Sequence, residues 1–133
     1  MNGLSVKDCM TRRPAQVTED ASIGTALARM RSADVRHLLV MDGDRLCGVV
    51  SVRDLRRLAG SMSASLLVEP VSRIMTDDPV TIAPDTPVAA AARVLLERKI
   101  GALPVRDGDD IIGIFTTADA LEALLAMWDP PGG

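Results

Sequence analysis

GVVSVRD, residues 48–54, and GIFTTAD, residues 113–119, are the two stretches that decide the fold. In both, a short apolar run ends in a hydroxyl residue, and an aspartate follows three positions later. Apolar β-branched residues favour strands, and a Ser or Thr placed three residues before a carboxylate favours the first turn of a helix. The chain is therefore predicted to contain the same strand-to-helix junction twice.

The two stretches belong to a tandem repeat, whose second copy follows the first at an offset of 65 positions, from Met10 to Met75. Residues 6–56 and 71–121 align without a gap. Identical pairs include Met10/Met75, Thr11/Thr76, Pro14/Pro79, Asp20/Asp85, Gly48/Gly113 and Asp54/Asp119. Two copies are too few for a solenoid, so the pattern indicates a duplicated unit.

The first half of each copy predicts a strand followed by an amphipathic helix. The strands are expected at residues 15–18 and 80–83, directly after the prolines. Apolar residues three and four apart then form one helix face in each copy: Ile23, Leu27 and Met30 in the first, and Val88, Ala91, Ala92 and Leu95 in the second. Thr86 and Pro87 predict the start of the second of these helices, with Thr86 as its cap.

The second half of each copy predicts a β-hairpin followed by another helix. Apolar runs flank Asp42-Gly43-Asp44 and Asp107-Gly108-Asp109, and Asp-Gly favours a tight turn because glycine tolerates positive φ. The closing helices are expected from Val52 to about Ala59 and from Thr117 to about Met127. Each copy thus has the order β-α-β-β-α.

We predict an α/β (α+β) fold made of two such units. A sheet of about three strands cannot hide its apolar face alone, so the two units are expected to pack about an internal pseudo-two-fold axis with equivalent clefts between them. The predicted boundaries are a first unit at residues 4–59, a connector at 60–68, a second unit at 69–127 and a flexible tail at 128–133.

The composition excludes several classes of protein. Aromatic residues make up only 2% of the 133 residues, the net charge is −3, and no basic run exceeds two residues, which argues against nucleic-acid binding. No apolar stretch reaches membrane-spanning length, so no membrane partner is expected and a cytoplasmic location is predicted. Hydrophobic residues at 47% fit a globular protein with an aliphatic core.

No pattern of catalytic or metal-binding residues is found. The single histidine excludes a multi-histidine metal site, and GxSxG, Walker and dinucleotide motifs are absent, so we expect neither a metal nor an enzyme. Cys9 and Cys47 lack CxxC spacing and stand where the second copy has Ile74 and Ile112. We interpret them as small buried apolar residues, with a disulfide or a metal site as the alternative.

The repeated G-x-x-[ST]-x-x-D pattern has two interpretations. Ser51 with Asp54, and Thr116 with Asp119, can form capping boxes that need no ligand. The same helix N-terminus also suits a phosphate, and a carboxylate there can accept hydrogen bonds from the two hydroxyls of a ribose. Gly48 and Gly113 would allow either a ligand or a neighbouring backbone to approach closely. From the residues alone, both interpretations stay open.

The doubled series of motifs resembles a pair of CBS (cystathionine β-synthase) domains, together called a Bateman module. It consists of MT-x-x-P at Met10 and at Met75, IGALPV at residues 100–105, the Asp-Gly turn, and G-x-x-[ST]-x-x-D. The resemblance covers about residues 4–127. It implies that an adenosine compound (AMP, ADP, ATP or S-adenosylmethionine) binds in the cleft between the units, and that modules associate as disk-like homodimers.

The resemblance also implies roles for particular residues. Asp54 and Asp119 are expected to hold the ribose, Ser51 and Thr116 to contact ribose or phosphate, and Val17, Thr81 and Ile82 to line the adenine. Arg36, His37 and Arg53 are expected to contact phosphate. Their counterparts in the second copy are Gly101, Ala102 and Ala118, so one competent phosphate site and one weaker or empty site are expected. Arg12 and Arg13 are interpreted as loop surface.

The predicted function is a regulatory adenine-nucleotide-binding module that requires no cofactor and signals through its conformation or its association. Its output would pass through its own homodimer or an unidentified effector protein. The alternative is a ligand-independent dimerisation or scaffold module. For that alternative, Leu121, Leu124, Leu125 and Trp128 would supply an apolar contact surface, unless they are core residues.

Overall fold

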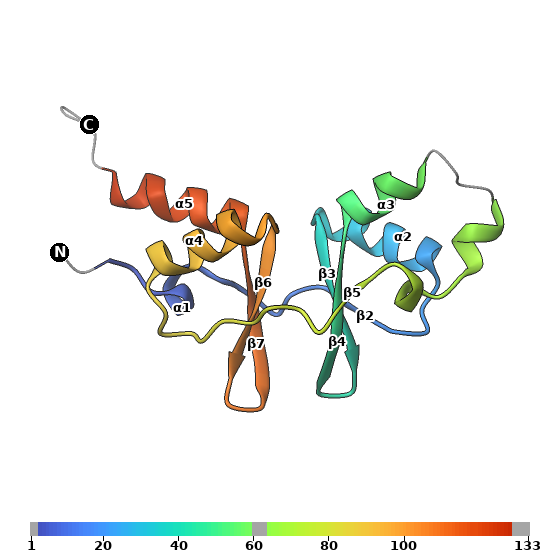
Figure 1. The fold of residues 1–133 in the computed structure, drawn as a ribbon, viewed down its shortest axis with the longest axis horizontal. Helices are drawn as coiled ribbons and strands as arrows, with labels where there is room; N and C mark the ends of the chain where they lie inside the picture. Colours follow the sequence, from blue (N-terminus) through green and yellow to red (C-terminus); the bar gives the residue numbers. More distant parts are fainter. Residues whose placement is uncertain (1–2, 60–63, 129–133) are drawn as a thin grey trace. The chain divides into compact units, whose positions relative to one another are not determined.

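The computed structural model describes residues 3–59 and 64–128, which form two compact units. We call residues 14–79 the Asp54 unit, and residues 3–13 together with 80–128 the Asp119 unit. Figure 1 shows helices and strands in both, as expected for an α+β fold. Most of the predicted tail, residues 129–133, and residues 60–63 of the predicted connector lie outside the described residues.

The Asp54 unit contains a four-stranded sheet in the order β2-β3-β4-β5. The strands are β2 (Gln16–Thr18), β3 (His37–Asp42), β4 (Arg45–Ser51) and β5 (Thr76–Asp77). β2 runs parallel to β3, and the other pairs are antiparallel. The helices are α2 (Ile23–Ala33) and α3 (Val52–Ala59), with the 3-10 turns η1 (Ala64–Val68) and η2 (Val71–Arg73).

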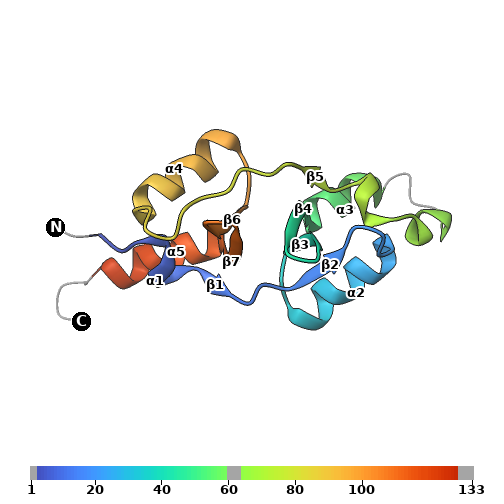
Figure 2. The same cartoon turned by 90° about the horizontal axis from the view of Figure 1, so that it is seen from below.

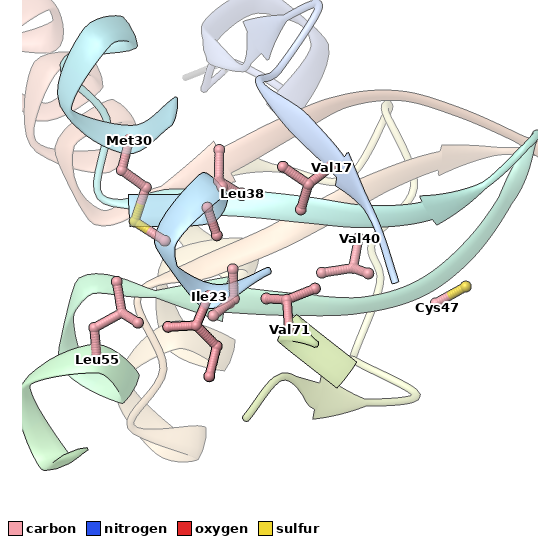
Figure 3. Close-up of a cluster of buried hydrophobic side chains, with 10 residues drawn as sticks. Val17, Ile23, Met30, Leu38, Val40, Cys47, Leu55 and Val71 are labelled. Carbon is pink, nitrogen blue, oxygen red and sulfur yellow. The ribbon is translucent and has the colours of Figure 1, made fainter. Parts of the chain in front are cut away.

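The core of the Asp54 unit lies between the sheet and α2. Figure 3 shows Ile23 and Met30 of α2 facing the same cluster as Leu38, Val40 and Val71, all of them buried. The predicted helix face is confirmed, with Leu27 at its edge packed against the cluster. Leu66 and Leu67 of η1 also pack against this core, so the described part of the connector is an integral piece of the unit.

The Asp119 unit contains a three-stranded sheet in the order β1-β7-β6. Its strands are β1 (Thr11–Arg12), β6 (Ala102–Asp107) and β7 (Asp110–Thr116). Its helices are α1 (Val6–Cys9), α4 (Val88–Arg98) and α5 (Thr117–Met127). α4 and α5 contact each other, and α1 contacts both, as the two views in Figures 1 and 2 agree. Phe115, Leu103 and Val6 are fully buried in the core that these elements enclose.

The compact units differ from the sequence repeats, because the two copies exchange their opening segments. Thr11 and Arg12, from the first copy, pair with Ile114 and Gly113 on β7 of the second. Thr76 and Asp77, from the second copy, pair with Val49 and Gly48 on β4 of the first, in the same register. The exchange brings residues more than a hundred positions apart into one unit.

Gly48 and Gly113 make room for the exchanged strands. A Cβ on Gly48 would lie 2.6 Å from the carbonyl oxygen of Thr76 and 2.8 Å from Sδ of Met75. A Cβ on Gly113 would lie 2.8 Å both from the carbonyl oxygen of Thr11 and from Sδ of Met10. Real Cβ atoms do not approach so closely, so a neighbouring backbone, one of the two predicted possibilities, explains why each motif begins with glycine.

Two local predictions need correction. The strand expected at residues 80–83 is reduced to one bridge between Ile82 and Val105, with the Ile82 N–H donating to the Pro104 carbonyl (3.0 Å). α4 begins after Pro87, which itself occupies the cap position, so Thr86 is not the cap. The Asp-Gly turns are confirmed by the positive φ of Gly43 (60°) and Gly108 (62°).

Candidate functional site

The repeated motif forms a capping box in both units. The Ser51 hydroxyl accepts the Asp54 N–H (3.1 Å), and Oδ2 of Asp54 accepts the Ser51 N–H (2.8 Å). Thr116 and Asp119 repeat this arrangement at 3.1 and 2.9 Å. The capping interpretation is therefore confirmed, and the cap satisfies two N–H groups at the start of each helix. A capping role leaves the second oxygen of each carboxylate free for another partner.

The two carboxylates differ in what else they contact. The Thr11 hydroxyl, delivered by β1, donates to Oδ1 (3.1 Å) and Oδ2 (3.3 Å) of Asp119, and Asp119 is only 7% exposed. Asp54 is half-buried, and its only hydrogen bonds in the described part of the chain are those of the cap. Thr76 stands where Thr11 stands in the other unit, but it makes no hydrogen bond to Asp54.

Basic side chains gather around the Ser51–Asp54 motif. His37 pairs with Ser51 across the β3–β4 ladder, and the Arg36 carbonyl accepts the Val52 N–H at the start of α3 (2.9 Å). Arg36 and Arg53 are exposed, and neither forms an ion pair with a carboxylate among residues 3–59 and 64–128. All three residues that were predicted to contact phosphate therefore lie at or next to this one junction.

His37 is half-buried, and its electrostatic surroundings are mixed. Burial lowers the pKa of His37 below its ordinary value, the charge of Asp54 opposes this by raising it, and Arg53 and Arg36 lower it further. The lowered pKa favours the neutral form of His37 in the free protein. A bound anion would favour its protonated form.

The strand exchange places two charged pairs, one basic and one acidic, in the unit opposite to their own sequence copy. Arg12 and Arg13 belong to the Asp119 unit, where the Arg12 guanidinium donates to the Lys7 carbonyl (3.3 Å). Asp77 and Asp78 belong to the Asp54 unit. Arg12 and Arg13, from the first copy, therefore lie in the same unit as the Asp119 motif. That motif has Gly101, Ala102 and Ala118 where the Asp54 motif has basic residues.

The predicted adenine-lining residues lie in different places. Val17 is buried in the core of the Asp54 unit, and Ile82 packs against the core of the Asp119 unit, beside the half-buried Thr81. Val17 also borders an open hollow of about 470 Å³ on the Asp54 unit, which contains neither Ser51 nor Asp54. The hollow is lined by Gln16, Val17, Thr18, Ala21, Thr25, Arg29, Met41 and Gly43.

Neither cysteine takes part in a disulfide. Cys47 is buried and Cys9 half-buried, each against the core of its own unit, and burial raises the pKa of both thiols. Raised pKa values keep thiols in the unreactive protonated form, which fits the predicted packing role. Within residues 3–59 and 64–128 no cluster of three or more His, Cys, Asp or Glu side chains is arranged to hold a metal, and no helix is long and apolar enough to cross a membrane.

Comparison with protein families matches the CBS domain twice, at residues 6–61 and 71–126. The chain belongs to the CBS domain family. The two matches together cover most of the sequence and coincide with the repeats rather than with the compact units. The predicted resemblance to a CBS pair is thereby confirmed.

Related proteins include both small CBS proteins and larger enzymes. A CBS domain-containing protein of Dictyostelium discoideum is 31% identical over 136 residues, which cover 94% of each chain. A homoserine O-acetyltransferase of Methanococcoides burtonii is 37% identical over 117 residues, but the match spans 86% of this chain and only 23% of the enzyme. The activity of the enzyme therefore does not transfer to this CBS pair.

Solved CBS-pair structures share the fold. CBSX2 from Arabidopsis thaliana has a TM-score of 0.82 at 32% identity, covering 95% of this chain and 97% of that one. The structure of CBSX2 in complex with AMP has the same TM-score at 34% identity, covering 94% of this chain and 98% of that one. These likenesses confirm the α+β fold of a CBS pair.

The contact that sequence reasoning missed is the bond between Thr11 and Asp119. The identity of Thr11 and Thr76 marks both as members of the repeated motif, yet the repeats place Thr11 in the copy that lacks Asp119. The sequence signal for this contact was the glycine of each motif, Gly48 and Gly113. Each glycine indicates that another backbone segment approaches closely, but it does not identify that segment.

Proposed function

We propose that this CBS pair is a regulatory module that binds an adenine nucleotide or a related adenosyl compound. Ligand binding would change its conformation or its association with an effector protein or a second copy. The observation that carries the proposal is the Asp54 carboxylate, which stands at a helix N-terminus, keeps Oδ1 unpartnered among the described residues, and is flanked by three basic side chains. CBSX2, at 34% identity, is known in complex with AMP.

The Asp54 motif offers the groups that a ribose needs. Oδ2 is used by the cap, so Oδ1 is free to accept a hydrogen bond from a ribose hydroxyl. The Ser51 hydroxyl accepts from the Asp54 N–H, and its own proton remains available for a ribose or phosphate oxygen. Capping and ligand binding are compatible at this residue pair because they use different atoms.

The surrounding charges favour a phosphorylated ligand at Asp54 over one at Asp119. Arg36 and Arg53 have no carboxylate partner in the described chain, and a phosphate would supply one. His37 gains a proton readily next to an anion, which adds a charge-assisted hydrogen bond. The Asp119 motif has Gly101, Ala102 and Ala118 at these positions, so its phosphate contacts would have to come from elsewhere.

A thermal-shift screen with AMP, ADP, ATP, NAD and S-adenosylmethionine tests the proposal. A ligand at 100 times its Kd stabilises the folded state by about 2.7 kcal/mol, so at least one compound should raise Tm by several degrees. Asp54→Asn keeps the size and the cap acceptor but removes the charge, and it should abolish most of the shift. Asp44→Asn, in the exposed hairpin turn, is the matched control and should respond like the wild type. No shift with any compound contradicts the proposal.

A second function, association without a ligand, is favoured by the surface of α5. Leu121, Leu124 and Leu125 are 56%, 58% and 69% exposed, so these side chains and the 63%-exposed Trp128 are surface residues and not core. Exposed leucines on one helix favour self-association. Light scattering should report a dimer that Leu124→Glu and Leu125→Glu dissociate together, whereas Val68→Glu, at an exposed apolar residue of the other unit, leaves it intact. A monomeric wild type contradicts this function.

A further inference from the structure

The two units place equivalent threonines next to equivalent motif strands. Thr11 pairs with Ile114, and Thr76 pairs with Val49, the residue of the first copy that corresponds to Ile114. The strand pairing is therefore the same, and both threonines take the same place in the ladder relative to the aspartate of the motif. Only one of them forms the bond.

In the Asp119 unit, the hydroxyl reaches the carboxylate. Thr11 Oγ1 donates to Oδ1 (3.1 Å) and to Oδ2 (3.3 Å) of Asp119, while Oδ2 also accepts the Thr116 N–H (2.9 Å). Both oxygens therefore have a donor, and the side chain is buried. Among residues 3–59 and 64–128, Oδ1 of Asp54 has no donor, and the Thr76 hydroxyl makes no hydrogen bond.

A ribose must bind to the acceptor positions that a carboxylate still offers. A carboxylate accepts at about four lone-pair positions on its two oxygens, so each hydroxyl of a ribose needs one of these positions. At Asp119 the Thr11 hydroxyl already donates to Oδ1, the oxygen that the cap does not use, and also lies within hydrogen-bond distance of Oδ2. A ribose hydroxyl that binds to Oδ1 must displace the Thr11 hydroxyl. The binding free energy then gains only the difference between the new hydrogen bond and the one that is lost.

We propose that Thr11 is a specificity-determining residue of the Asp119 site. Its hydroxyl stands in for a ribose hydroxyl in the ligand-free protein and weakens ribose binding at Asp119 relative to Asp54. The inference rests on the proposed function, and it names a residue outside the G-x-x-[ST]-x-x-D motif as the cause of unequal sites. It predicts that removal of the Thr11 hydroxyl strengthens ligand binding, which a merely structural role would not do.

The test uses the Asp54→Asn protein, in which Asp119 is the remaining motif carboxylate. Calorimetric titration with adenosine compares this background with its Thr11→Val and Thr76→Val derivatives. We expect Thr11→Val to tighten adenosine binding roughly tenfold, the equivalent of one lost competing hydrogen bond to a charged group. Thr76→Val, the matched control, should change the affinity less than twofold because Thr76 has no bond to lose.

Two further measurements separate competition from a general change of the fold. 2′,3′-Dideoxyadenosine lacks the ribose hydroxyls, so the gain from Thr11→Val should vanish with this probe. Thr11→Ser keeps the hydroxyl and should bind adenosine like its parent. Thr11 is an exposed residue, so valine is expected to fold there, and Thr11→Ala tests the same loss if it does not. Melting curves establish that each variant is folded.

The outcomes distinguish this inference from the proposed function. If Asp54→Asn weakens adenosine binding but Thr11→Val and Thr76→Val behave alike, the role of Thr11 is wrong and the binding function stands. If Thr11→Val weakens binding, Thr11 helps to hold the ligand and the inference is overturned. If no variant and not even the wild type binds adenosine or AMP, both fail together.

Discussion

The Asp54 unit and the Asp119 unit build the same junction and surround it differently. In the Asp119 unit, the aspartate is buried. It caps α5 and also accepts a hydrogen bond from Thr11 on the exchanged strand β1. In the Asp54 unit, the aspartate caps α3 and otherwise stays available beside Arg36, His37 and Arg53. The same junction therefore holds a buried carboxylate whose two oxygens both accept hydrogen bonds in one unit, and a half-buried carboxylate with one oxygen still available in the other.

The strand exchange, which both units share, should show the largest effect. Gly48→Ala would place a Cβ 2.6 Å from the Thr76 carbonyl oxygen, and Gly113→Ala would place one 2.8 Å from that of Thr11. A backbone neighbour cannot rotate away, so each variant should lose about 3 kcal/mol of unfolding free energy, measured by urea denaturation.

Gly3→Ala serves as the control for this pair, because nothing lies within 4 Å of its Cβ position. It should change the unfolding free energy by less than about 0.5 kcal/mol. Equal stability of Gly48→Ala and the control would show that β5 does not pair with β4 in solution. The same result at Gly113 would apply to β1 and β7.

The next largest effect should be the difference in unfolding free energy lost when each of the two aspartates is replaced. Asp119→Ala deletes the cap partner and leaves the Thr11 hydroxyl without its acceptor, so it should cost about 2 to 3 kcal/mol. Asp54→Ala deletes only the cap partner and should cost about 1 kcal/mol. Urea denaturation measures both, and Thr11→Val should remove most of the excess at Asp119. Equal costs would break the distinction between a structural and an available aspartate.

The duplicated elements were predictable because local chemistry decides them. Gly43 and Gly108 allow the hairpin turns, Ser51 and Thr116 begin the closing helices, and both amphipathic faces are where the spacing places them. The exchange was not predictable, because β1 and β5 have two residues each and carry no pattern of their own. The bond between Thr11 and Asp119 joins residues 108 positions apart, and only the folded chain shows it.

The basic side chains beside the Asp54 motif should favour AMP over adenosine. Arg36→Ala combined with His37→Ala should weaken AMP binding by more than about tenfold and adenosine binding far less, because only AMP carries the phosphate that these side chains would contact. Arg45→Ala is the control, as Arg45 is an exposed arginine that pairs with Asp42 in the hairpin. Calorimetry with both ligands measures the ratio. An equal loss for AMP and adenosine would remove these residues from the phosphate site.

The smallest effect should be the pH dependence that His37, the single histidine of the chain, gives to the Asp54 unit. Burial lowers the pKa of His37, so the unfolded chain takes up its proton at a higher pH than the folded protein does. The stability that neutral His37 contributes is therefore complete above the unfolded value of about 6.5 and declines as the pH falls towards the lower folded value. The wild type should lose more stability between pH 7.5 and 5.5 than His37→Gln, measured by urea denaturation at each pH.

Bound AMP should instead favour the protonated form of His37, because a phosphate stabilises the imidazolium charge. AMP should therefore bind the wild type more tightly at pH 6 than at pH 7.5, and adenosine should not. If AMP shows the same pH dependence in His37→Gln as in the wild type, the titrating group lies elsewhere and His37 does not face the phosphate.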